Sequence, residues 1–252
     1  MRYALKHLPN QGLLCLCLLF FGFFAKAQTS KVEELLTKLN PNDPDTVQIG
    51  VLRKLSAAYT AVDPIKKFYY ANQYRLLAEK NNIDSNIANA YLDMGISYGV
   101  RSNLDSALYY FKIGQQKAKT SGYQNGLARS LVNIGFVHDR SDKKQLAVHC
   151  YEDALKIFRA LDYKKGINQC ITNLGAIYFD LKEYKSADNY FQQVLDNLKQ
   201  HPGDELTMGN ALYSLGGSKR RLGEFGKSMD YYLKSLAIRE KIGDLNGIAL
   251  SN

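Results

Sequence analysis

The stretch GINQCITNLGAIYFDLKEYKSADNYFQQVLDNL, residues 166–198, holds a glycine, a small residue twelve positions later and an aromatic ring four positions after that. The same three residue types return along the chain, with steps of 40, 40 and 41 residues between the glycines. A fixed period of this size is typical of repeat arrays, in which each unit buries its apolar side only against its neighbours. The glycines are Gly95, Gly135, Gly175 and Gly216, the small residues are Ala107, Ala147, Ala187 and Ser228, and the rings are Phe111, Tyr151, Phe191 and Tyr232.

Each unit is predicted to contain two helices. Apolar residues in 166–180 recur with a largely helical spacing, as Ile167, Ile171 and Leu174 illustrate. A polar break at 181–183 is followed by a second helical pattern over 184–198. The links between units all end in a glycine, and glycine and asparagine suit the left-handed turn that ends a helix. The chain is therefore expected to be all-α.

The glycine and the small residue of each unit predict a close approach of its two helices. Glycine inside a helix costs about 1 kcal/mol relative to alanine, so it is kept where another backbone comes near. We expect Gly95 to lie beside Ala107, with the ring of Phe111 filling the space one turn further on. Burying such a ring contributes about 1.5–3 kcal/mol.

This pattern resembles the tetratricopeptide repeat, which has a glycine and then an aromatic residue on its first helix, and an alanine, an aromatic residue and an alanine on its second. Tyr98 and Tyr178 supply the first aromatic residue, whereas His138 and Lys219 depart from it. Only Ala154 matches at the last alanine position. The usual period is about 34 residues, so these units look like a lengthened variant. The resemblance implies a right-handed α-solenoid of antiparallel helix pairs.

The resemblance also implies a division of the chain. A leading helix and a divergent first repeat are expected in 28–84, because LSAAY at 55–59 is similar to MGISY at 94–98. Residues 247–252 repeat the opening of the third unit and are interpreted as the start of a further, truncated repeat, so we expect this sequence to be the front part of a longer protein. The four clearer repeats cover 85–246, at about 85–124, 125–164, 165–204 and 205–246.

The first 27 residues have the layout of a secretory signal peptide. A basic start is followed by an apolar run over 12–24 and by Ala25-Lys26-Ala27, with small residues where a signal peptidase reads. Cleavage is predicted between Ala27 and Gln28, which would place the mature chain in the periplasm or outside the cell. The alternatives are a membrane anchor, for which the run is short, and a lipoprotein signal at Cys15 or Cys17. Any membrane contact is expected only through this segment or through a missing downstream segment.

The charge of the chain does not favour a nucleic-acid partner. The net charge is +9, but the basic residues are scattered as pairs such as Lys66-Lys67 and Lys143-Lys144. A nucleic-acid-binding protein usually concentrates them on one face. The expected partner is therefore a protein or a peptide.

No combination of residues predicts catalysis, a cofactor or a metal site. His138, His149 and His201 lack metal-ligand spacing with cysteines or acids. Residues 223–228 (GEFGKS) end like a phosphate-binding loop, but Arg221 stands where that motif needs glycine. After signal cleavage Cys150 and Cys170 remain, and they are either two buried thiols or a disulfide.

A candidate peptide-binding surface follows from helical geometry. At 100° per residue, positions −6, −3 and −2 from each helix glycine lie opposite the apolar arc, so their polar side chains line one surface across several units. A lysine-based carboxylate clamp is not supported, because Leu92, Val132, Thr172 and Tyr213 occupy the position where it would need lysine. Alternatively, Asn133 and Asn173 bond to a neighbouring helix and merely hold the stack. The candidate residues, called the polar row below, are Arg129, Asn133, Gln169, Asn173, Asn210 and Tyr213.

These observations favour a non-catalytic protein- or peptide-binding module. A signal peptide, a leading helix and lengthened repeats look like the extracytoplasmic sensory or scaffolding part of bacterial signalling proteins. The alternative is a free periplasmic or secreted assembly factor. An enzyme has no supporting residue.

Overall fold

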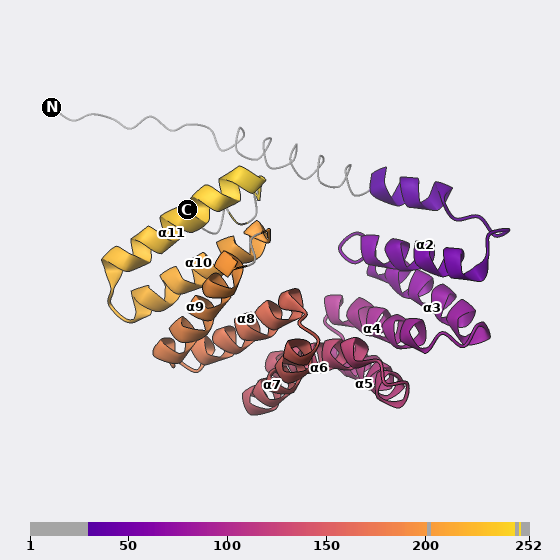
Figure 1. The fold of residues 1–252 in the computed structure, drawn as a ribbon, viewed down its shortest axis with the longest axis horizontal. Helices are drawn as coiled ribbons and strands as arrows, with labels where there is room; N and C mark the ends of the chain where they lie inside the picture. The colour runs from indigo at the N-terminus through magenta and orange to yellow at the C-terminus, as the bar shows by residue number, and fades with distance from the viewer. Residues whose placement is uncertain (1–29, 201–202, 245–246, 248–252) are drawn as a thin grey trace. The chain divides into compact units, whose positions relative to one another are not determined.

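A computed structural model describes residues 30–200, 203–244 and 247. The expected signal peptide at 1–27, and all but Gly247 of the expected truncated repeat, lie outside the described residues. Residues 30–37 are helical, and the described part of the chain contains no strand. The helices that follow are α2 (Asp45–Ala58), α3 (Pro64–Lys80), α4 (Asp84–Val100), α5 (Leu104–Thr120), α6 (Gln124–Arg140), α7 (Lys144–Ala160), α8 (Lys164–Asp180), α9 (Tyr184–Gln200), α10 (Glu205–Arg221) and α11 (Phe225–Ile242) (Figure 1).

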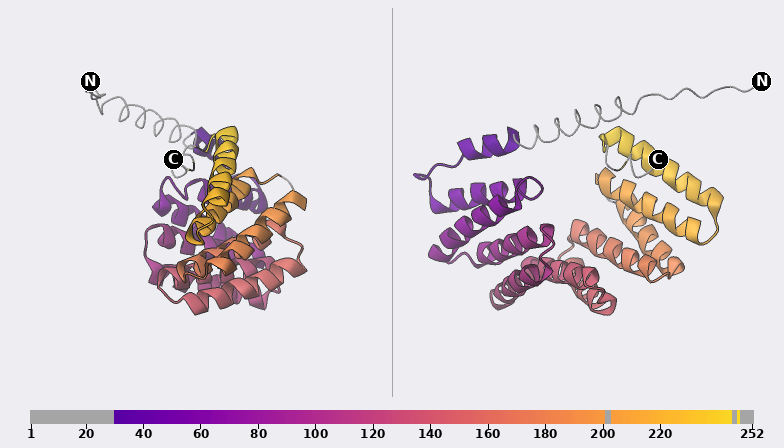
Figure 2. Two further views of the ribbon diagram at one scale, coloured as in Figure 1. Left: turned by 90° about the vertical axis from the view of Figure 1, so that its left-hand side faces the viewer. Right: turned by 180° about the vertical axis from the view of Figure 1, so that it is seen from behind.

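The helices form two compact units, residues 1–110 and 111–252, with the boundary inside α5. In the first unit α2 packs on α3 and α3 packs on α4. In the second unit each helix from α6 to α11 packs on the next one in the chain. Successive helices run antiparallel within each unit (Figure 2). The all-α stacking of helix pairs predicted from the sequence is confirmed.

Eight helices end in a left-handed turn whose central residue has a φ between 50° and 79°. At the end of α8 this residue is Lys182, and the backbone N–H of Glu183 then donates to the carbonyl of Tyr178 at 2.9 Å. Such a bond satisfies a carbonyl that the helix end would otherwise leave unpaired. The link glycines do not all serve this purpose. Gly122 has a φ of 69°, but Gly166 lies inside α8, where a Cβ would come within 2.6 Å of the Phe158 ring.

The helix glycines are required by the aromatic rings of the second helices. A Cβ on Gly175 would lie 2.7 Å from Cε1 of Phe191, and one on Gly216 would lie 2.7 Å from Cδ1 of Tyr232. The expectation that the ring sits one turn beyond the glycine is therefore wrong, because the ring fills the space that the missing side chain leaves. The small residue also touches this point, since the hydroxyl of Ser228 donates to the carbonyl of Gly216 at 2.8 Å.

Gly175→Ala should lower the free energy of unfolding of the second unit by about 1–3 kcal/mol, as overpacking does. Its matched control is Gly226→Ala in α11, where nothing lies within 4 Å of the added Cβ. The control should be neutral or stabilise the protein by up to about 1 kcal/mol, because alanine favours the helix. Urea unfolding of both variants measures the difference. Equal midpoints would show that the Phe191 ring does not need the glycine.

Candidate peptide-binding site

The polar row has its free hydrogen-bonding groups on α6 and α8. Gln169 is exposed and Asn173 is half-buried, and neither side chain makes a hydrogen bond to another described residue. Asn133 is half-buried, and its Nδ2 donates to the carbonyl of Arg129, one turn earlier on the same helix, at 2.8 Å. This bond stays within α6, so it does not hold a neighbouring helix. The Oδ1 atom of Asn133 retains its capacity to accept a hydrogen bond.

The other two residues of the polar row are engaged by an arginine of α11. Nη2 of Arg239 donates to Oδ1 of Asn210 at 2.8 Å, and the guanidinium group lies 5.6 Å from the ring centre of Tyr213. Tyr213 also packs against Tyr232, with 5.3 Å between the ring centres. Arg239 is only 4% exposed and pairs with Asp244 at 2.8 Å. Asn210 and Tyr213 therefore hold α10 to α11, and the remaining candidates for ligand binding are Arg129, Asn133, Gln169 and Asn173.

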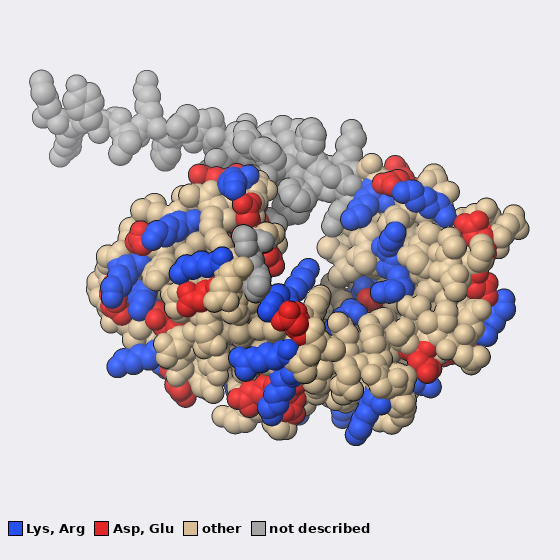
Figure 3. Space-filling view, in the orientation of Figure 1, with Lys and Arg blue, Asp and Glu red and all other residues tan. Residues whose placement is uncertain are grey.

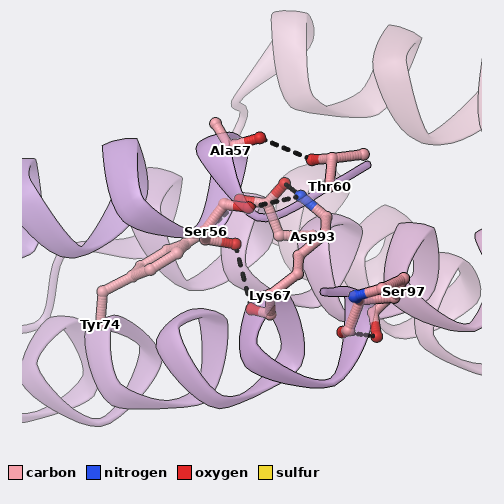
Figure 4. A network of polar contacts seen from close by, with 8 residues as sticks. Ser56, Ala57, Thr60, Lys67, Tyr74, Asp93 and Ser97 are labelled. Atoms are coloured by element: carbon pink, nitrogen blue, oxygen red, sulfur yellow. Dashed lines mark hydrogen bonds and ion pairs between the residues drawn. The ribbon is translucent and has the colours of Figure 1, made fainter. Parts of the chain in front are cut away.

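A buried ion pair in the first unit was not predicted from the sequence. Nζ of Lys67 is 2.9 Å from Oδ1 of Asp93 and 3.4 Å from the carbonyl of Ser56, and the hydroxyl of Tyr74 donates to Oδ2 of Asp93 at 2.6 Å (Figure 4). Lys67 is 2% exposed. Asp93 stands at the same position relative to its helix glycine as Asn133 and Asn173 do. In the first unit this position therefore contacts the preceding second helix.

The signal for this pair was present in the repeat period. Forty residues before Ala107 stands Lys67, and forty before Phe111 stands Ala71. The divergent first repeat thus has its small residue at the ring position and a long side chain at the position of the small residue. Because Ala71 is fully buried, the lysine stem and Tyr74 supply the volume that a ring supplies elsewhere.

Asp93→Asn should lower the free energy of unfolding of the first unit by about 3–5 kcal/mol, because it leaves the ammonium group of Lys67 buried without a counter-charge. Adding Lys67→Met should recover most of this loss, since no unpaired charge then remains. Lys66→Met, at the exposed neighbouring position, should change the stability by no more than about 0.5 kcal/mol. Urea unfolding followed by circular dichroism tests all three variants. A double variant as unstable as Asp93→Asn would contradict the pairing.

The thiols and histidines offer no reactive centre in the described residues. Cys150 and Cys170 are both free. Burial raises the pKa of Cys170 to about 12 and also raises the pKa of Cys150, so both are thiols rather than nucleophilic thiolates at neutral pH. Burial lowers the pKa of His138, with Lys143 and Lys112 acting in the same direction. Within the described ranges, no group of three or more histidine, cysteine or acidic side chains is placed to bind a metal ion.

Two further properties of the surface concern partners. Basic and acidic side chains are interspersed on the face of each unit seen in Figure 3. Among the residues that the structure describes, no helix combines the length and the hydropathy needed to cross a bilayer.

Comparison with known proteins identifies the repeats. A family model described as "Tetratricopeptide repeat" matches residues 168–241, and a second model with the same description matches residues 128–160. The chain is therefore a tetratricopeptide-repeat protein. The structure accounts for the match, because α6 to α11 present the helix glycine, the small residue and the ring of this repeat at matching places.

Two curated relatives share this pattern at low identity. The chain is 27% identical over 212 residues to "Outer dynein arm-docking complex subunit 4" of Danio rerio, covering 78% of this chain and 41% of the relative. It is 23% identical over 167 residues to "Cell division cycle protein 16 homolog" of Mus musculus, covering 65% of this chain and 25% of the relative. The chain thus spans well under half the length of each relative.

Solved structures of similar fold come from several kinds of protein. BtubC (BKLC) from P. vanneervenii matches with a TM-score of 0.69 and 18% identity, over 87% of this chain and 91% of that one. A Rap protein complexed with Competence and Sporulation Factor matches with a TM-score of 0.68 and 13% identity, over 92% and 70%. A signal transduction ATPase with a tetratricopeptide repeat sensor, from Pyrococcus horikoshii, matches with a TM-score of 0.59 and 16% identity, over 88% and 38%. At these identities the likeness shows the fold alone.

Proposed function

We propose that this chain is a non-catalytic module that binds a protein or peptide partner, and that it forms the exported sensory or scaffolding part of a bacterial signalling protein. Tetratricopeptide repeats and the similarity to a Rap protein complexed with a named factor support the binding role. The similarity to a signal transduction ATPase with a repeat sensor supports the sensory role by analogy. The layout of residues 1–27 supports export.

The observation that carries the proposal is the pair of asparagines at matching positions on α6 and α8. Asn133 and Asn173 stand forty residues apart, and their side chains keep hydrogen-bonding atoms that no other described side chain occupies. Gln169 adds a further free amide to α8. An extended peptide has unpaired backbone donors and acceptors, and amide side chains supply both partners. These residues would therefore hold a peptide backbone that crosses α6 and α8.

Replacing both Asn133 and Asn173 by alanine should weaken binding by tenfold or more, because each lost hydrogen bond to a neutral partner contributes about 0.5–1.5 kcal/mol. A phage-displayed random peptide library, selected on the mature chain, supplies the probe, and fluorescence anisotropy measures its affinity. The thermal midpoint should stay nearly unchanged, since the bond from Asn133 to Arg129 lies within one helix. A lower midpoint with affinity intact in the folded protein would instead assign both asparagines to the stack.

Export is tested separately. When the full sequence is produced in a Gram-negative host, the periplasmic protein should begin at Gln28, because signal peptidase cuts after the small residue Ala27. N-terminal sequencing of that fraction gives the answer. A protein that retains Arg2 in the membrane fraction would favour the anchor, and one that retains it in the cytoplasm would exclude export.

A further inference from the structure

A groove lies between α7 and α9, on the side of α8 that faces away from the polar row. Its larger part has a volume of about 720 Å³ and its smaller part about 250 Å³. Arg159 of α7 and Gln193 of α9 line both parts, so the two form one continuous depression. Ile167, Ile171 and Leu174 of α8 form its floor. At 100° per residue, this floor lies about 150° around α8 from Gln169 and Asn173. We name it the α7–α9 groove.

One wall of the groove is a row of amide side chains along α9. Asn189, Gln193, Asn197 and Gln200 all line it, at helical spacing. Asn197 donates to the buried Asn168 at 2.9 Å, whereas the side chains of Asn189, Gln193 and Gln200 make no hydrogen bond to described residues. The row spans about 16 Å along the helix axis. This is the length of about five extended residues.

The opposite wall, on α7, carries two unpaired charges of opposite sign. Neither Arg159 nor Glu152 makes an ion pair with a described residue, although both line the larger part of the groove. The lysines of the groove differ, since Lys156 is paired with Asp153 at 3.0 Å and Lys164 with Asp162 at 2.5 Å. Arg159 and Glu152 are two helical turns apart, or about 10 Å. Glu183 adds a second acid near Glu152, at the end of the groove where Tyr178 and Tyr190 stack with 5.3 Å between their ring centres.

We propose that the α7–α9 groove binds an extended peptide segment that has an acidic residue at one end, a basic residue at the other and two apolar residues between them. In an extended chain, residues one and five point to the same side and are about 13 Å apart, so their side chains reach Arg159 and Glu152. Residues two and four point the other way, onto Ile171 and Leu174. The amides of α9 pair with the peptide backbone. A helical ligand fits less well, because its backbone groups are already bonded to one another.

The probe is the fluorescein-labelled peptide Asp-Val-Ser-Val-Lys with blocked termini, and its affinity is measured by fluorescence anisotropy at low salt. We expect saturable binding with a Kd below about 1 mM. The scrambled peptide Val-Val-Ser-Asp-Lys, in which acid and base are adjacent, should bind at least about tenfold more weakly, since a charge-assisted hydrogen bond is lost. Equal affinity for the two peptides, or no saturation, would overturn the proposal.

Charge reversal in the protein tests the pairing. Arg159→Glu and Glu152→Arg should each weaken binding of the first peptide by about tenfold or more. The double variant should restore the affinity, because the same peptide can then bind in the opposite direction. Failure of the double variant to recover at least most of the loss would contradict the assignment of these two side chains.

Two control variants separate this groove from the polar row. Arg140→Glu makes the same charge change at an exposed position of α6 and should leave the affinity unchanged. The double replacement of Asn133 and Asn173 by alanine should also leave it unchanged, because these side chains lie on the other face. If that replacement abolished binding of the probe, the peptide would be bound by the polar row and the groove assignment would fail. Arg159 and Glu152 are exposed, so a thermal midpoint equal to that of the unmodified protein confirms that each variant is folded.

Discussion

The contact between a second-helix ring and a first-helix glycine sets the geometry of each repeat. Phe191 lies so close to Gly175 that no side chain fits between them, and Tyr151 and Tyr232 stand in the same relation to Gly135 and Gly216. A helix can approach its partner this closely only at a position without a Cβ, so the contact fixes which residues of the two helices meet. Dense packing then decides the positions of the surrounding side chains. The regular period follows from it, because 17-residue helices and three-residue turns return each glycine to the same place.

Much of this architecture is readable from the sequence, since local rules determine it. The helix pairs follow from the spacing of apolar residues, and the left-handed turn at Gly122 follows from glycine. The contacts between helices are harder to predict. Angular positions on a helical wheel placed Asn210 and Tyr213 on an open polar surface, but Arg239 of the partner helix reaches both. A helical wheel contains one helix only, and a long side chain on the neighbouring helix decides which polar groups stay free.

The candidate surfaces show the same limit. The apolar arc of α8 was expected to be covered, because Ile171 and Leu174 are hydrophobic and the arc is continuous. In the structure the arc is the floor of a depression, since α7 and α9 pack against its two sides and leave the middle open. One first helix thus presents polar amides on one side and an apolar, charge-edged channel on the other. Two chemically different ligand types can therefore be distinguished by a single repeat.

The buried pair of Lys67 and Asp93 has a consequence for how the protein changes over generations. Either residue alone cannot be exchanged for a neutral one without passing through a protein that carries a buried, uncompensated charge. Both codons must then change nearly together, or the first unit must first gain stability elsewhere. The pair should behave as one inherited character: where a descendant sequence regains alanine at position 67, position 93 should have lost its carboxylate and position 71 should have regained a ring.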